Sequence, residues 1–170
     1  MKTKKPASRS PVPRPAPEIG QLLPFYDIGG PSYFGYRIVL AAKHFDRAIQ
    51  KLLAQHSDLT LPEWRVMAQL GLVPDGTVRS LADGAAVDRA EISRATRSLE
   101  TRGLVRRRED RSDRRSPVFS LTPAGRRRFR TVRKPISDFI VHLIHGVGSR
   151  DLDAANRALW ALTRGCLHFA

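Results

Sequence analysis

The fold of this chain is decided by residues 86–122, which read AVDRAEISRATRSLETRGLVRRREDRSDRRSPVFSLT. Asp88 is followed three residues later by Glu91, a spacing typical of the capping box that begins an α-helix. We therefore predict a helix that starts near Asp88 and ends at Gly103. On a 3.6-residue wheel this helix has one face that packs inward and one that is small, polar and cationic. The inward residues are Ile92, Ala95, Thr96 and Leu99, and the outward ones are Ala90, Ser93, Arg94, Arg97 and Thr101.

A β-hairpin is predicted directly after this helix. Residues 104–108 and 117–121 have the pattern of two short strands, and the charged loop 109–116 joins them. Before the helix, residues 79–85 predict a shorter helix that reaches Asp88 through a turn at residues 86–87. Two helices joined by a turn and followed by a hairpin define a winged helix-turn-helix. We therefore expect a mainly α fold with a small β-wing, to which Thr77-Val78 add a short third strand.

Short motifs in this region resemble those of the MarR family of transcriptional regulators. They are Leu99-Glu100-x-x-Gly103-Leu104-Val105-x-Arg107, Asp113-Arg114-Arg115-Ser116, Leu121-Thr122-Pro123-Ala124-Gly125, Leu61-x-x-x-Trp64-Arg65-Val66-Met67 and Leu81-Ala82. The resemblance runs from about Ser32 to the C-terminus, and it implies a homodimer. One departure is Ala86, where many members of that family have a turn glycine.

The pattern along the chain predicts four segments. Residues 1–18 are expected to be a disordered basic, Pro-rich arm, and residues 19–57 an N-terminal dimerisation segment and helix. Residues 58–122 are the expected winged helix-turn-helix domain. Residues 123–170 are expected to form C-terminal dimerisation helices, since one side of them is too apolar for a lone small domain.

The net charge of +14 points to a polyanionic partner. Residues 88–134 hold 16 Lys or Arg against 6 Asp or Glu, and residues 1–18 hold 5 against 1. The rest of the chain is neutral, so the excess charge lies where contacts to DNA phosphates are expected.

A dimer of winged helices predicts a pseudo-palindromic operator, with half-site centres about 34 Å apart. In the major groove Arg94 and Arg97 are the expected base readers, since a guanidinium matches guanine O6 and N7; phosphate contact is the alternative for Arg97. Ala90 is expected near a thymine methyl, and Ser93 and Arg89 at phosphate or base edges.

The tip of the hairpin is expected to enter an A·T-rich minor groove through Arg111 or Arg114. The family resemblance further implies that Asp113 orients Arg115 through a salt bridge that braces the wing. Arg106, Arg107 and Arg108 alternate along a strand, so at most two of them share a face.

The resemblance also implies a possible effector, a small aromatic or phenolic anion bound near the dimer helices. The candidate pocket residues combine aromatic rings with cationic groups; an alternative is that the aromatic ones are core. They are Tyr33, Tyr36, Arg37, His44, Trp64 and Arg65.

Other functions are disfavoured by what the sequence lacks. The sequence shows no nucleophile with a base, paired carboxylates or metal cluster, so we do not expect an enzyme. Cys166 is the only cysteine, so we expect neither an intrachain disulfide nor a cysteine metal site. His142 and His145, three residues apart on a helix, are the alternative metal ligands, but Asp138 is the one carboxylate near them, and we expect no metal site. No apolar run approaches the roughly 20 residues of a membrane helix, so we expect a cytoplasmic, nucleoid-associated protein.

We conclude that the chain is a DNA-binding repressor, with a sequence-indifferent architectural nucleic-acid binder as the alternative.

Overall fold

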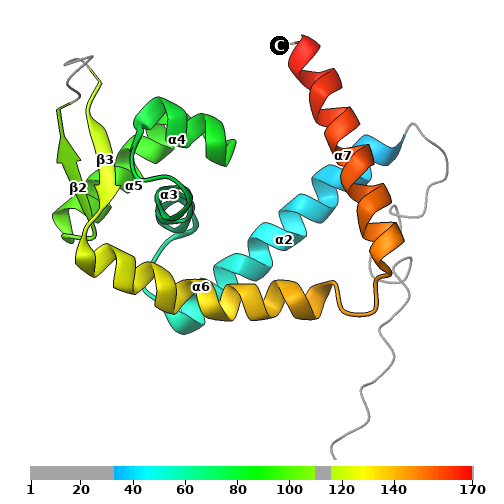
Figure 1. The fold of residues 1–170 in the computed structure, drawn as a ribbon, viewed down its shortest axis with the longest axis horizontal. Helices are drawn as coiled ribbons and strands as arrows, with labels where there is room; N and C mark the ends of the chain where they lie inside the picture. The colour runs from blue at the N-terminus through cyan, green and yellow to red at the C-terminus, as the bar shows by residue number, and fades with distance from the viewer. Residues whose placement is uncertain (1–32, 110–115, 170) are drawn as a thin grey trace, which may run out of the picture. The chain divides into compact units, whose positions relative to one another are not determined.

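The computed structural model describes residues 33–109 and 116–169, which form mostly helices and one small sheet (Figure 1). The elements in chain order are α2 (Phe34–His56), α3 (Leu61–Leu72), β1 (Gly76–Thr77), α4 (Val78–Ala85), α5 (Arg89–Thr101), β2 (Val105–Arg108), β3 (Val118–Leu121), α6 (Pro123–Leu143) and α7 (Ser149–Phe169).

The chain divides into two units between Phe45 and Asp46, within α2. The predicted fold class, mainly helical with a winged helix-turn-helix, is confirmed. The division at residues 45–46 is not the one predicted between the dimerisation segment and the DNA-binding domain, and the four predicted segments stay a prediction.

The sheet is antiparallel, in the order β1-β3-β2. Arg106 lies opposite Ser120 and Arg107 lies opposite Phe119 in the β2–β3 pair, while Thr77 pairs with Val118. The predicted third strand is therefore present, one residue earlier than expected.

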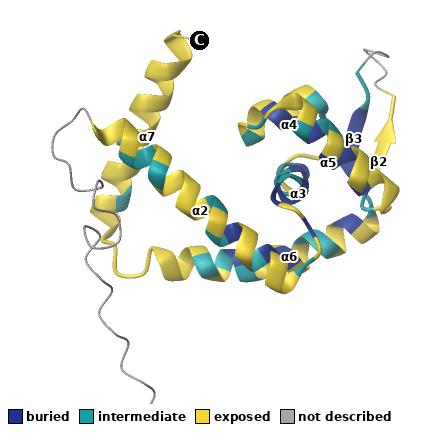
Figure 2. Ribbon diagram, turned by 180° about the vertical axis from the view of Figure 1, so that it is seen from behind, coloured by how far each residue is buried: buried dark blue, intermediate teal, exposed yellow. Residues whose placement is uncertain are grey.

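The core of the second unit lies between α3, α4, α5 and the sheet. Figure 2 shows buried positions gathered on α3 and on β3, whereas most of β2 is exposed. Val66, Met67, Ile92 and Leu99 have no exposed surface. Because Ile92 and Leu99 belong to the inward face predicted for α5, burial of that face fixes which side of the helix reaches solvent.

Side-chain caps determine where the helices begin. Thr60 and Glu63 form a complete capping box at α3, and Thr122 accepts a hydrogen bond from the Gly125 amide at α6. At α5 only half of the predicted box is formed. The Asp88 side chain accepts hydrogen bonds from the amides of Ala90 and Glu91. Within the described residues, the Asp88 amide donates no hydrogen bond to the Glu91 carboxylate. One short acceptor is enough to start the helix.

The turn between α4 and α5 is held in a left-handed conformation. Ala86 has φ 50° and ψ 47°, and its amide donates to the carbonyls of Ala82 and Asp83. It is the one residue other than glycine with positive φ among those described. A Cβ at such a position costs roughly 1–2 kcal/mol, so the departure noted in the sequence is a site of backbone strain.

Replacing Ala86 by glycine should relieve this strain. We expect Ala86→Gly to raise the free energy of unfolding by up to about 1 kcal/mol, since the relief is partly offset by the entropy of glycine in the unfolded chain. Chemical denaturation measures the change. The matched control Ala85→Gly, in the last turn of α4, should lower the stability instead. An Ala86→Gly variant less stable than the parent would contradict the strain.

Candidate nucleic-acid interface

The outer face of α5 presents unpaired cations to solvent. Arg89, Arg94 and Arg97 are exposed, and their side chains form no hydrogen bond or ion pair within the described part of the chain. Ala90 is exposed between them, and Ser93 is half-buried. The five residues predicted for the recognition helix therefore lie on one helix, and three guanidinium groups are available to a ligand. Their roles on DNA stay predictions.

The inner face of α5 is tied to α3 by a buried carboxylate. The Glu63 side chain is 7% exposed, and the residue as a whole 5%. One of its oxygens accepts from Ser98 Oγ at 2.6 Å and from Arg102 Nη1 at 3.2 Å, and the other accepts from the Thr60 amide at 2.8 Å. Both oxygens are thus satisfied, which offsets the cost of burying the charge. The carboxylate fixes the C-terminal half of α5 against the start of α3.

The same network continues to α6. Arg102 also pairs with Asp58 at 2.7 Å, and Asp58 pairs with Arg128 of α6. The bond from Arg128 is the main reason why the pKa of Asp58 lies below its ordinary value. These residues connect the C-terminal end of α5 with α6, the helix that follows the wing. The sequence did not predict this network, because its members lie 35–70 residues apart.

The base of the wing is basic on both faces. Arg106 donates a hydrogen bond to Ser120 Oγ at 3.0 Å, and Arg108 forms an ion pair with Asp75. Arg107 is exposed on the opposite face of the strand. The wing-tip candidates Arg111, Asp113, Arg114 and Arg115 lie outside the described residues, so minor-groove entry and the brace of Asp113 on Arg115 stay predictions.

The predicted effector residues fall in both units. Tyr33, Tyr36 and His44 are exposed and Arg37 is half-buried in the first unit. In the second, Trp64 is buried and stacks on Phe129 with ring centroids 5.7 Å apart, and Arg65 pairs with Asp46 at 2.7 Å. Trp64 therefore belongs to the core. A pocket shared by all six residues stays a prediction.

The described ranges offer neither a metal centre nor a membrane span. No group of three or more His, Cys, Asp or Glu side chains there is arranged to hold a metal ion. No helix among the described residues is long and apolar enough to cross a membrane.

The fold and the exposed cationic face of α5 are those of a winged helix-turn-helix protein. Comparison with known proteins narrows this class further. Residues 57–116 match the model of the MarR family. The HTH-type transcriptional regulator TtmR of Methylorubrum extorquens (strain PA1) is 30% identical over 118 residues, which are 69% of this chain and 57% of TtmR. The matched region thus spans little more than half of that relative.

Solved structures share the fold. A MarR family transcriptional regulator from Silicibacter pomeroyi DSS matches with a TM-score of 0.70 and 23% identity, over 81% of this chain and 95% of that one. BpsR of Bordetella bronchiseptica, whose DNA binding is regulated by 6-hydroxynicotinic acid, matches with a TM-score of 0.67 and 20% identity, over 76% and 92% of the two chains. Residues 57–116 therefore match the MarR family in sequence, and the described residues have the fold of MarR family regulators.

The buried carboxylate predicts a specific acid sensitivity. Burial acts to raise the pKa of Glu63, but the bonds from Ser98 and Thr60 and the charge of Arg102 outweigh it and place the pKa below its usual range. A lowered folded-state pKa stabilises the fold above the unfolded-state pKa of about 4.3, and this contribution is lost as the pH falls through the lower folded-state value.

We expect Glu63→Gln to lower the free energy of unfolding by about 2 kcal/mol at pH 7, and to flatten its decline below about pH 4.5. Urea denaturation at a series of pH values measures both. The exposed control Glu100→Gln should change stability by less than about 0.5 kcal/mol. A Glu63→Gln variant that kept the full pH dependence of the parent would show that the network contributes nothing.

Proposed function

We propose that this chain is a sequence-specific DNA-binding transcriptional regulator that acts as a homodimeric repressor on a pseudo-palindromic operator. The observation that supports it best is the exposed outer face of α5. There Arg89, Arg94 and Arg97 form no ion pair with any described residue, whereas the inner face is buried in the core. A helix anchored on one side and cationic on the other fits the major groove. The match to the MarR family and the relative TtmR, named a transcriptional regulator, support the same assignment.

Base reading on α5 gives the first test of this proposal. We expect Arg94→Ala to lower the affinity for a selected operator by roughly 10- to 100-fold, while the affinity for random DNA falls far less, because a bidentate contact to guanine is worth about 1–3 kcal/mol. Arg97→Ala should act similarly if it reads a base, and should weaken both affinities alike if it holds a phosphate.

Fluorescence anisotropy with operator and random duplexes measures both affinities. Arg150→Ala, an exposed arginine at the start of α7, is the matched control and should bind operator like the parent. Equal affinity of the parent for operator and random DNA would favour the sequence-indifferent architectural reading instead.

The proposal of a homodimer rests on apolar surface at the C-terminal end of the chain. None of the described residues of α7 is buried, although the helix is 21 residues long. Large hydrophobic side chains are at least a third exposed both near the end of α6 and along α7, more than a soluble monomer normally presents. They are Ile140, Val141, Leu143, Ile144, Leu159, Trp160, Leu162, Leu167 and Phe169. A second copy of the chain would cover them, with the predicted N-terminal segment as a further contact.

We expect the parent to have twice the mass of one chain by sedimentation, and Trp160→Glu to shift it toward one chain, since a charge in an apolar interface is costly. Trp160 is 68% exposed, so its replacement should leave each chain folded, as circular dichroism would verify. Asn156→Glu on the same helix places an equal charge at an exposed polar position and should leave the dimer intact. A parent that sedimented as a single chain at all concentrations would exclude the dimer.

We further propose that a small-molecule effector releases the protein from DNA. BpsR shares the fold, and 6-hydroxynicotinic acid regulates its DNA binding. A ligand can shift the equilibrium only by its difference in affinity for the bound and free forms, so it must contact elements whose arrangement changes.

A further inference from the structure

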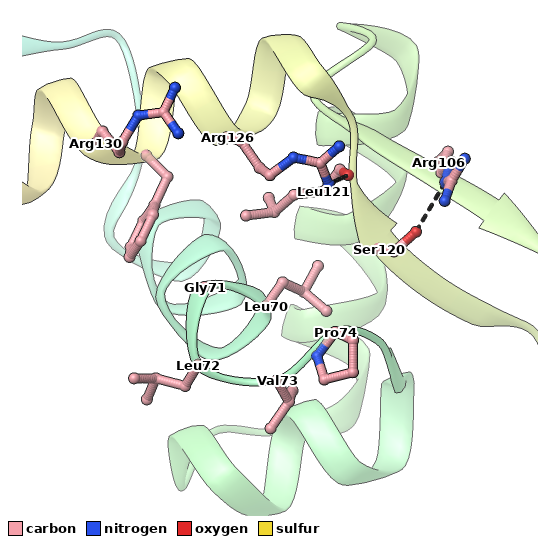
Figure 3. A pocket seen from close by; sticks show the side chains of 11 residues that line it. Leu70, Gly71, Leu72, Val73, Pro74, Arg106, Ser120, Leu121, Arg126 and Arg130 are labelled. Carbon is pink, nitrogen blue, oxygen red and sulfur yellow. Dashed lines mark hydrogen bonds between the residues drawn. The ribbon is translucent and has the colours of Figure 1, made fainter.

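A hollow of about 500 Å³ lies on the second unit, behind the base of the wing. It is bounded by the C-terminal end of α3, by β2 and β3, and by the first turns of α6 (Figure 3). None of the predicted DNA contacts or effector residues lines it, so it is a separate feature of the surface. Its volume falls within the range of small-molecule sites.

The floor of the hollow is apolar. Leu70 and Leu121 are 4% and 3% exposed, and Pro74 and the ring of Phe129 complete the lining around them. The Phe129 ring is held by stacking on Trp64 and by the Arg133 guanidinium, which lies over the ring at 5.9 Å from its centroid. A flat apolar group would therefore meet a surface that is already rigid.

The rim of the hollow is cationic. Arg126 and Arg130 come from α6, and Arg106 comes from β2 (Figure 3). No Asp or Glu lines the hollow, and none of the three arginines forms an ion pair within residues 33–109 and 116–169. Three uncompensated guanidinium groups around one concavity attract an anion.

Two of these guanidinium groups are fixed in position. Arg126 Nη1 donates to the Leu121 carbonyl at 2.8 Å, and Arg106 Nε donates to Ser120 Oγ at 3.0 Å. Each guanidinium has five N–H donors, so most of them remain for a ligand. The Ser120 hydroxyl proton is a further donor. Because these donors are already fixed, less of the binding free energy is lost in ordering the side chains.

We propose that this hollow binds a small organic anion with a flat apolar body, such as an aryl carboxylate. The carboxylate meets the arginine rim and the ring lies on Leu70, Leu121 and Phe129. A DNA phosphate would satisfy the rim alone, and it has no apolar part for the floor. The binding itself is independent of the proposed function, whereas any effect on operator affinity rests on it.

Isothermal titration of the full chain with 2-naphthoate tests the site, with 2-naphthamide and inorganic phosphate as matched ligands. We expect 2-naphthoate to bind at one site per chain and the neutral amide to bind at least tenfold more weakly, because hydrogen bonds to charged groups are the stronger ones. Phosphate should also bind at least tenfold more weakly, since it leaves the apolar floor uncovered. Equal affinities of naphthoate and naphthamide, or of naphthoate and phosphate, would overturn the proposal, as would no binding at millimolar naphthoate.

Arg130→Gln should weaken naphthoate binding about tenfold. The control Arg127→Gln, three residues earlier on α6 and outside the hollow, should not. Both arginines are exposed, so both variants should fold like the parent. An equal loss in both variants would overturn the site, as would a loss of DNA affinity in Arg130→Gln with naphthoate binding unchanged. Naphthoate binding by a chain that bound no DNA would support this site and refute the proposed function; DNA binding without naphthoate binding would do the reverse.

Discussion

The arrangement of this protein depends on one buried carboxylate. Glu63 begins α3 as part of its capping box, and it also accepts hydrogen bonds from Ser98 and Arg102 near the end of α5. A charge buried to this degree is stable only when its partners stay in place, so the reading helix cannot rotate about its axis without leaving it unpaired. The outward direction of Arg94 and Arg97 follows from this constraint and from the burial of Ile92 and Leu99.

Local chemistry in the sequence was sufficient to predict the elements that carry the proposed function. The Thr60–Glu63 box, the Asp88 cap and the Thr122 cap each depend on residues within one turn of the helix that they begin, and all three side chains act as caps. The inward face of α5 followed from the helical period alone. Ala86 stood out as a departure from the resembling family, and the structure gives the physical meaning, a left-handed turn formed without glycine.

Long-range pairing was not predictable. The ion pairs of Arg102 with Asp58 and Glu63, and of Arg128 with Asp58, join residues whose proximity only the folded chain creates. The hollow behind the wing has the same origin, because its three arginines come from two elements that are distant in sequence. Trp64 was a candidate for the effector pocket, with a place in the core as the alternative. In the structure its ring is buried in the core against Phe129.

The proposed function requires that α5 contacts the major groove in two symmetric half-sites. Methylation protection on a duplex selected from a random pool tests this directly, since dimethyl sulfate modifies guanine N7 in the major groove and adenine N3 in the minor groove. We expect two patches of protected guanines, centred about 10 base pairs apart and related by a two-fold axis. Protection of adenines alone, or a pool that yields no preferred sequence, would contradict it.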